Sequence, residues 1–72
     1  MKKKINISSA NDAINIVRFA TTNGDGIYIL KDSIKIDAKS FLGVVSLIAK
    51  ENLQIELPDD LILSSEVEKL VS

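Results

Sequence analysis

Two stretches of the chain alternate strictly between polar and apolar residues. They are residues 4–7 (KINI) and residues 53–57 (LQIEL), and period-two alternation is typical of a strand with one buried face. We predict strands over both stretches, the second ended by Pro58, because proline interrupts the hydrogen bonding of a strand. The side chains expected in the core are Ile5, Ile7, Leu53, Ile55 and Leu57, and those expected in solvent are Asn6, Gln54 and Glu56.

The segment after the first strand has helical periodicity. Ser9 and Asp12 have the spacing of a capping box, which predicts a helix start, and the Asn and Gly residues of 23–26 predict its end. The expected inward stripe, at spacings of three and four, is Ala10, Ala13, Ile14, Val17 and Ala20, with Ile16 and Phe19 on its flank.

The second half predicts a hairpin and two further helices. Residues 27–30 and 34–36 read as strands joined by the polar turn 31–33. Residues 39–49 read as a short helix with Ser40 as N-cap, and a last helix falls between residues 61 and 71, where Ser65 and Glu68 form a second possible capping box. The expected apolar positions of the second helix are Phe41, Val44, Val45, Leu47 and Ile48.

This order, β-α-β-β-α-β-α, predicts one domain over residues 1–72. We expect an α+β two-layer open-faced sandwich, with a four-stranded, mainly antiparallel sheet and three helices on one face. The other face of the sheet would meet water.

The composition limits the possible chemistry. The chain has no cysteine and no histidine, which removes disulfides, thiolate metal sites and any nucleophile paired with an imidazole. Its net charge is −1, and the basic residues form only one short cluster, at residues 2–4, so nucleic acid is not an expected partner. No stretch is long and apolar enough to span a membrane, and the default expectation is a cytoplasmic protein.

One segment resembles a known family. Residues 36–47 read IDAKSFLGVVSL, and the order Lys39-Ser40, two apolar residues, Gly43, two apolar residues, Ser46-Leu47 is similar to the regulatory-serine segment of the HPr phosphocarrier proteins. These proteins belong to the phosphoenolpyruvate-dependent sugar phosphotransferase system of bacteria. The resemblance covers about a dozen positions densely and the rest of the chain through the order of its elements. It implies an HPr-like fold.

The phosphocarrier site of that family is absent from this chain. In HPr the first helix opens with the phosphorylated histidine, and the corresponding position here is Ser9, in the run Ser8 to Ala13. A serine ester is too stable to pass phosphate onward as an imidazole does, and Asp12 would repel an incoming phosphoryl group. We therefore exclude histidine phosphocarrier activity and expect no enzyme activity, no cofactor and no metal. The aspartates are scattered at turns without the spacing of a calcium loop.

The resemblance implies a regulatory role for Ser40 and a docking role for its neighbours. Ser40 would be the serine that a dedicated kinase phosphorylates, although a helix cap alone would also explain it. Lys39, Leu42 and Val45 would contact partner proteins of the phosphotransferase or carbon-regulation network; alternatively, Leu42 and Val45 are core residues and Lys39 a solvated charge. Gly43 would serve either close packing or a weak point in the helix.

The first hypothesis is thus a non-catalytic HPr-like interaction domain that is regulated at Ser40. The alternative is a small-ligand-binding module of ferredoxin-like type, because β-α-β-β-α-β is also the order of that fold. In that case residues 23–26 would line the ligand site.

Overall fold

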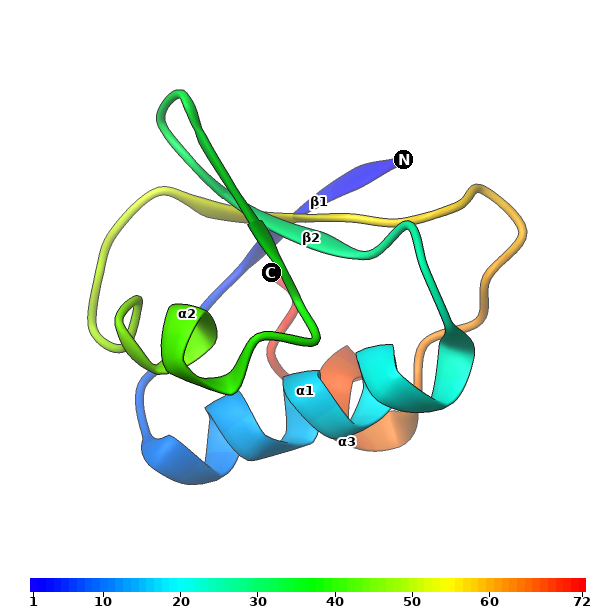
Figure 1. The fold of residues 1–72 in the computed structure, drawn as a ribbon, viewed down its shortest axis with the longest axis horizontal. Coiled ribbons are helices and arrows are strands. Elements are labelled where there is room, and N and C mark those ends of the chain that lie inside the picture. The colour runs from blue at the N-terminus through cyan, green and yellow to red at the C-terminus, as the bar shows by residue number, and fades with distance from the viewer.

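The computed structural model describes all residues from Met1 to Ser72, and these form a sheet with helices on one side (Figure 1). The strands are β1 (Lys2–Ile5), β2 (Tyr28–Lys31), β3 (Ile34–Asp37) and β4 (Leu53–Glu56); the helices are α1 (Ala10–Asn23), α2 (Phe41–Val45) and α3 (Ser65–Glu68). The sheet order is β1-β4-β2-β3, and each neighbouring pair is antiparallel. The predicted α+β class, element order and four-stranded sheet are confirmed.

The core lies between the sheet and the helices. All 15 buried residues are hydrophobic, and no buried side-chain polar atom lacks a hydrogen-bond partner. The five apolar residues predicted to point inward from the first and last strands, Ile5, Ile7, Leu53, Ile55 and Leu57, are all buried. Ile29 and Ile55, on the two central strands, are opposite each other and completely enclosed.

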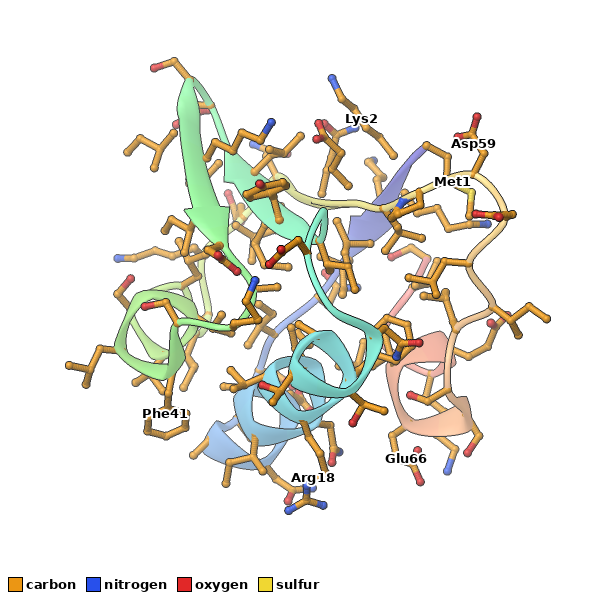
Figure 2. The ribbon with its side chains drawn as sticks, turned by 45° about the vertical axis from the view of Figure 1, so that its right-hand side comes forward. Met1, Lys2, Arg18, Phe41, Asp59 and Glu66 are labelled. Atoms are coloured by element: carbon orange, nitrogen blue, oxygen red, sulfur yellow. The ribbon has the colours of Figure 1, made fainter.

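The first strand begins and ends two residues earlier than predicted. β1 pairs with β4 from Lys2↔Glu56 to Ile5↔Leu53, after which the chain leaves the sheet. From there it pairs with the C-terminal segment, since the Asn6 amide donates to the Leu70 carbonyl at 2.9 Å. Ile7 therefore enters the core from a loop and not from a strand. At the other end of β1, the Met1 amino group lies 2.8 Å from the Asp59 carboxylate (Figure 2).

The start and end of α1 are as predicted, and Ala13 and Ala20 of the predicted inward stripe are buried, but the rest of the buried face differs from the prediction. Ser9 caps the helix, and Gly24, with a φ of 81°, follows its last residue. The buried residues are Ala13, Ile16, Phe19 and Ala20, whereas Ala10 is exposed and Ile14 is 38% exposed. Ile14 and Ile16 lie about 200° apart around a helix, so only one of them can face the sheet. The prediction chose the wrong one.

The other two helices are shorter than predicted. After Val45 the chain continues in tight turns, and Ala49 adopts a φ of 64° while its amide donates to the Ile7 carbonyl at 2.7 Å. The amides of Leu47 and Ile48 donate to the carbonyls three residues earlier, those of Val44 and Val45, so the α-helix ends at Val45 and the predicted extent to residue 49 is wrong. The cap of α3 is Ser64 and not Ser65, because the Ser64 hydroxyl accepts the Val67 amide. None of the helices is both long and apolar enough to cross a membrane.

Candidate protein-interaction site

Ser40 is the N-cap of α2. Its Oγ accepts a hydrogen bond from the Gly43 amide at 3.2 Å, and its carbonyl accepts one from the Val44 amide at 2.9 Å. The predicted capping role is therefore confirmed. The residue is exposed, so its hydroxyl is also accessible from solvent.

Gly43 allows α2 to approach β3 closely. A Cβ atom at this position would lie 2.7 Å from the Cγ2 of Ile36 and 3.0 Å from the Oγ of Ser40. The first distance is shorter than any ordinary contact between carbon atoms, so a side chain here would push α2 away from the strand. Of the two roles considered from the sequence, close packing is the one that the structure supports.

Lys39 is held by two carboxylates. Its ammonium lies 3.0 Å from Asp25 and 3.2 Å from Asp37, and these hydrogen bonds, first from Asp25 and then from Asp37, raise the pKa of Lys39. The pKa of Asp37 is lowered, mainly by a hydrogen bond from the Lys39 amide and then by its ammonium. Lys39 thus links the loop after α1 to the end of β3, a role that its position in the sequence did not indicate.

Two large apolar side chains of α2 face solvent. Leu42 is 81% exposed and Phe41 is 46% exposed, while Val45 is half-buried and packs on the core. Of the two alternatives left open for Leu42, the outward position is the one that the structure shows. Phe41 was expected to point inward, and its exposure contradicts that expectation. Val44 is the residue of this short helix that is buried, and Leu42 lies about 200° away from it around the helix axis.

Helix α1 extends this apolar surface. Ile14, Val17 and Phe41 line a shallow hollow of about 300 Å³ between the two helices, together with Arg18, Thr21 and Thr22. Figure 2 shows Phe41 pointing from α2 toward α1. We call the four apolar residues Ile14, Val17, Phe41 and Leu42 the α1–α2 patch. The contribution of α1 was missed because Ile14 had been assigned to the core; Val17 does pack on the core, as predicted, and also lines the hollow.

Ser9, which the resemblance to HPr aligns with the phosphocarrier histidine, lies in a network of hydrogen bonds at the start of α1. The Ser9 hydroxyl accepts the Asp12 amide at 3.2 Å, and the Asp12 carboxylate accepts both the amide and the hydroxyl of Ser8 at 2.9 Å. These bonds, above all that from the Ser8 amide, lower the pKa of Asp12. The positive end of the α1 dipole therefore already has a carboxylate of the chain itself beside it.

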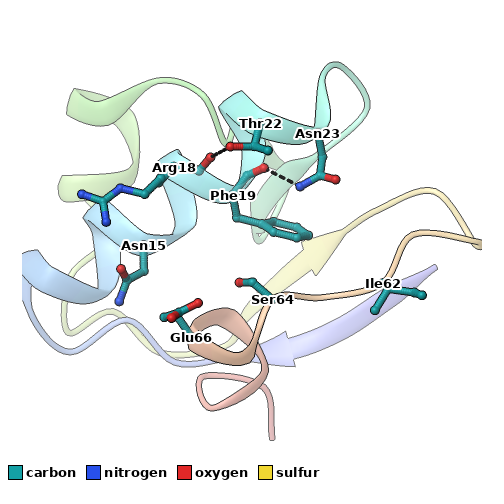
Figure 3. A pocket seen from close by; sticks show the side chains of 8 residues that line it. All are labelled: Asn15, Arg18, Phe19, Thr22, Asn23, Ile62, Ser64 and Glu66. Atoms are coloured by element: carbon teal, nitrogen blue, oxygen red, sulfur yellow. Dashed lines mark hydrogen bonds between the residues drawn. The ribbon is translucent and has the colours of Figure 1, made fainter.

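A second hollow, of about 380 Å³, lies between α1 and the segment before α3 (Figure 3). Three of its polar side chains bond to the backbone: Asn23 donates to the Phe19 carbonyl at 2.8 Å, Thr22 donates to the Arg18 carbonyl at 2.9 Å, and Ser64 accepts the Val67 amide at 3.3 Å. Of residues 23–26, which the ligand-binding alternative places at a site, only Asn23 lines this hollow. No group of three or more carboxylates is close enough together to hold a metal ion.

Comparisons with known proteins find no match to this chain. No family model matches the chain, and no curated protein and no solved structure matches it either. The similarity to HPr therefore stays a hypothesis that rests on residues 36–47 and on the order of the elements.

Proposed function

We propose that this chain is a non-catalytic, HPr-like protein-interaction domain that binds other proteins through the α1–α2 patch. The observation that carries the proposal is the exposure of Leu42 and Phe41, which are 81% and 46% exposed on adjacent positions of one helix. Single exposed apolar residues are common, but a group of them on two neighbouring helices is typical of a recognition surface. The binding of a partner would remove this apolar area from water.

The surroundings of the patch suggest the chemistry of the partner. Arg18 lies at the margin of the hollow and takes part in none of the ion pairs of the chain. A partner that inserts apolar side chains between Ile14 and Phe41 and presents a carboxylate to Arg18 would match both features. We expect such partners among the proteins of the phosphotransferase or carbon-regulation network, a serine kinase included.

Phosphorylation of Ser40 would provide regulation. A phosphate adds about two negative charges at pH 7, and Ser40 is two residues from Leu42 in the chain. A partner that presents a carboxylate to Arg18 would be repelled by this added charge. The hydrogen bond that the Ser40 Oγ accepts from the Gly43 amide would be replaced by bonds that the phosphate oxygens accept from the amides of the first turn of α2.

The proposal can be tested with purified HPr kinase and ATP. We expect the wild-type chain to gain one phosphate by mass spectrometry and Ser40→Ala to gain none. Leu42→Glu should lower kcat/KM of the kinase for the chain about tenfold or more, because it places a carboxylate in the docking surface.

Ile62→Glu is the matched control, because Ile62 is 86% exposed and lies outside the patch. It should leave kcat/KM unchanged. Absence of phosphate on the wild-type chain, or a modified Ser40→Ala variant, would remove the proposed switch. Equal effects of Leu42→Glu and Ile62→Glu would remove the α1–α2 patch as the docking surface.

A further inference from the structure

Strand β3 is at an open edge of the sheet. It pairs only with β2, and the two-residue turn Asp32–Ser33 joins them. The residues next to such a turn, Lys31 and Ile34, form a hydrogen-bonded pair, and such pairs then recur at every second residue. The bond from the Ala38 amide to the Ile27 carbonyl, at 3.0 Å, continues this pattern. The backbone groups of Lys35 and Asp37 therefore point away from β2.

These outward groups are almost free. No backbone group outside the strands bonds to Lys35, and at Asp37 only the carbonyl is engaged, by the Ser40 amide at 2.9 Å. A carbonyl oxygen has a second lone pair and can accept another bond. The edge thus offers two amides and two carbonyls to an additional strand.

The opposite edge of the sheet is protected. β1 carries three consecutive lysines, Lys2 to Lys4, which disfavour pairing with another chain. The C-terminal segment also covers it in part, because the Ser72 amide donates to the Lys4 carbonyl at 3.0 Å and Val71 bridges to Ile5. β3 has no comparable cover, and its Ile34 is 57% exposed.

The side chains of β3 are complementary to those of a second β3. Lys35 and Asp37 are two residues apart and lie on the outer face of the sheet, with opposite charges. Ile34 and Ile36 lie on the face that carries the helices. When two such strands run antiparallel around a two-fold axis at Ile36, each Lys35 lies opposite an Asp37 and the two Ile36 residues face each other.

We propose that β3 pairs with β3 of a second copy of this chain, in antiparallel orientation, with Lys35 opposite Asp37 of the second copy. In this register the outward backbone amide and carbonyl of Lys35 lie opposite those of Asp37 in the second copy. The backbone hydrogen bonds and the charge pairs therefore form together. Shifting the strands by two residues places Lys35 opposite Lys35, or Asp37 opposite Asp37, and like charges at directly opposite positions are unfavourable. The pairing would extend the sheet from four strands to eight across the two copies.

The existing contacts of these side chains leave room for the pairing. Lys35 lies 3.2 Å from Glu56 and 4.3 Å from the centre of the Tyr28 ring, and Asp37 is bound by Lys39. These are exposed contacts, which are weak individually, and both groups can take a further partner. Because two four-residue strands bury little area, we expect a dissociation constant on the order of 100 µM.

Sedimentation equilibrium from about 10 µM to about 1 mM tests the proposal, since this range spans the expected constant. The wild-type chain should pass from 7.9 kDa toward twice that mass as its concentration rises. Lys35→Glu and Asp37→Lys should each raise the dissociation constant roughly tenfold, because each places like charges opposite one another at two symmetric positions. The double variant Lys35→Glu/Asp37→Lys restores opposite charges and should dimerise like the wild type.

Lys4→Glu is the control, because it makes the same charge change on the outer face of the opposite edge strand. It should leave the dissociation constant unchanged. A synthetic chain with an Nα-methyl group on Lys35 removes the edge-facing donor without changing charge, and should be monomeric. The proposal is overturned by a wild-type chain that stays monomeric, by single variants that dimerise normally, or by a double variant that stays dissociated.

Discussion

At the scale of single residues, Gly43 is the position whose size matters most for the candidate site. Glycine inside a helix normally lowers stability relative to alanine, because it loses more backbone entropy on folding. Here the absence of a side chain lets α2 lie against Ile36 and keeps the Ser40 hydroxyl within reach of the Gly43 amide. The same glycine therefore sets both the position of the helix and the geometry of its cap.

We predict that Gly43→Ala lowers the free energy of unfolding by about 1–3 kcal/mol, as overpacking does, although helix propensity alone would raise it. Denaturant titration followed by circular dichroism measures the change. In an Ile36→Ala background the clashing methyl group is gone, so Gly43→Ala should cost much less there. An equal cost in both backgrounds would mean that the contact with Ile36 is not the cause.

At the scale of elements, the N-terminus of α1 is stabilised by a charged side chain. The Asp12 carboxylate accepts two hydrogen bonds from Ser8, and the Ser9 hydroxyl accepts the Asp12 amide. A carboxylate in the first turn also interacts favourably with the helix dipole. Ionisation of Asp12 and formation of the helix start are therefore linked.

This linkage predicts a pH dependence of stability. The pKa of Asp12 is lowered in the folded state, from an ordinary value of 3.8, so its stabilising contribution is complete above that value and is lost as the pH falls through the lowered pKa. Asp37 and Asp59, whose pKa values are also lowered, contribute with the same sign. We expect the free energy of unfolding to fall less steeply between about pH 6 and pH 2 in Asp12→Asn than in the wild type.

Asp60→Asn is the control for this experiment, because Asp60 is exposed and forms none of the ion pairs of the chain. It should leave the slope of stability against pH unchanged. A slope that is as steep in Asp12→Asn as in the wild type would contradict the role assigned to the carboxylate.

At the scale of the whole molecule, stability depends on one apolar core and on nothing else of comparable strength. There are no disulfides, no metal cluster and no buried charged residue, and the ion pairs lie at the surface. Ile29 and Ile55 occupy the middle of this core on the two central strands. Because a small chain has little stability to spare, a single large cavity should be enough to unfold much of the population.

We therefore predict that Ile29→Ala lowers the free energy of unfolding by about 2–5 kcal/mol, through lost burial and a cavity. Ile62→Ala removes the same atoms from a side chain that is 86% exposed, and should change stability by less than about 0.5 kcal/mol. Urea unfolding of both variants measures the contrast. Similar losses in the two variants would contradict the single-core description.

The local patterns of the sequence determined which segments are strands and helices and where several of them are capped. The alternation of residues 53–57, the Ser9 cap and the Gly24 stop act through neighbours in the chain, so they can be read without knowing the fold. The cap at Ser40 belongs to the same class. These local features were sufficient to predict most of the order of helices and strands.

The tertiary structure decided the order of the strands, the buried face of α1 and the composition of the α1–α2 patch. Ile14 and Ile16 are equally apolar, and only the placement of the sheet and α2 selects which of them is buried. Phe41 is 46% exposed although it lies three residues before the buried Val44, a spacing that places both on one side of a helix, so the periodicity of α2 does not show this exposure. The link from Lys39 to Asp25 and the open edge of β3 likewise arise from contacts between distant segments, and periodicity along the chain carries no information about those contacts.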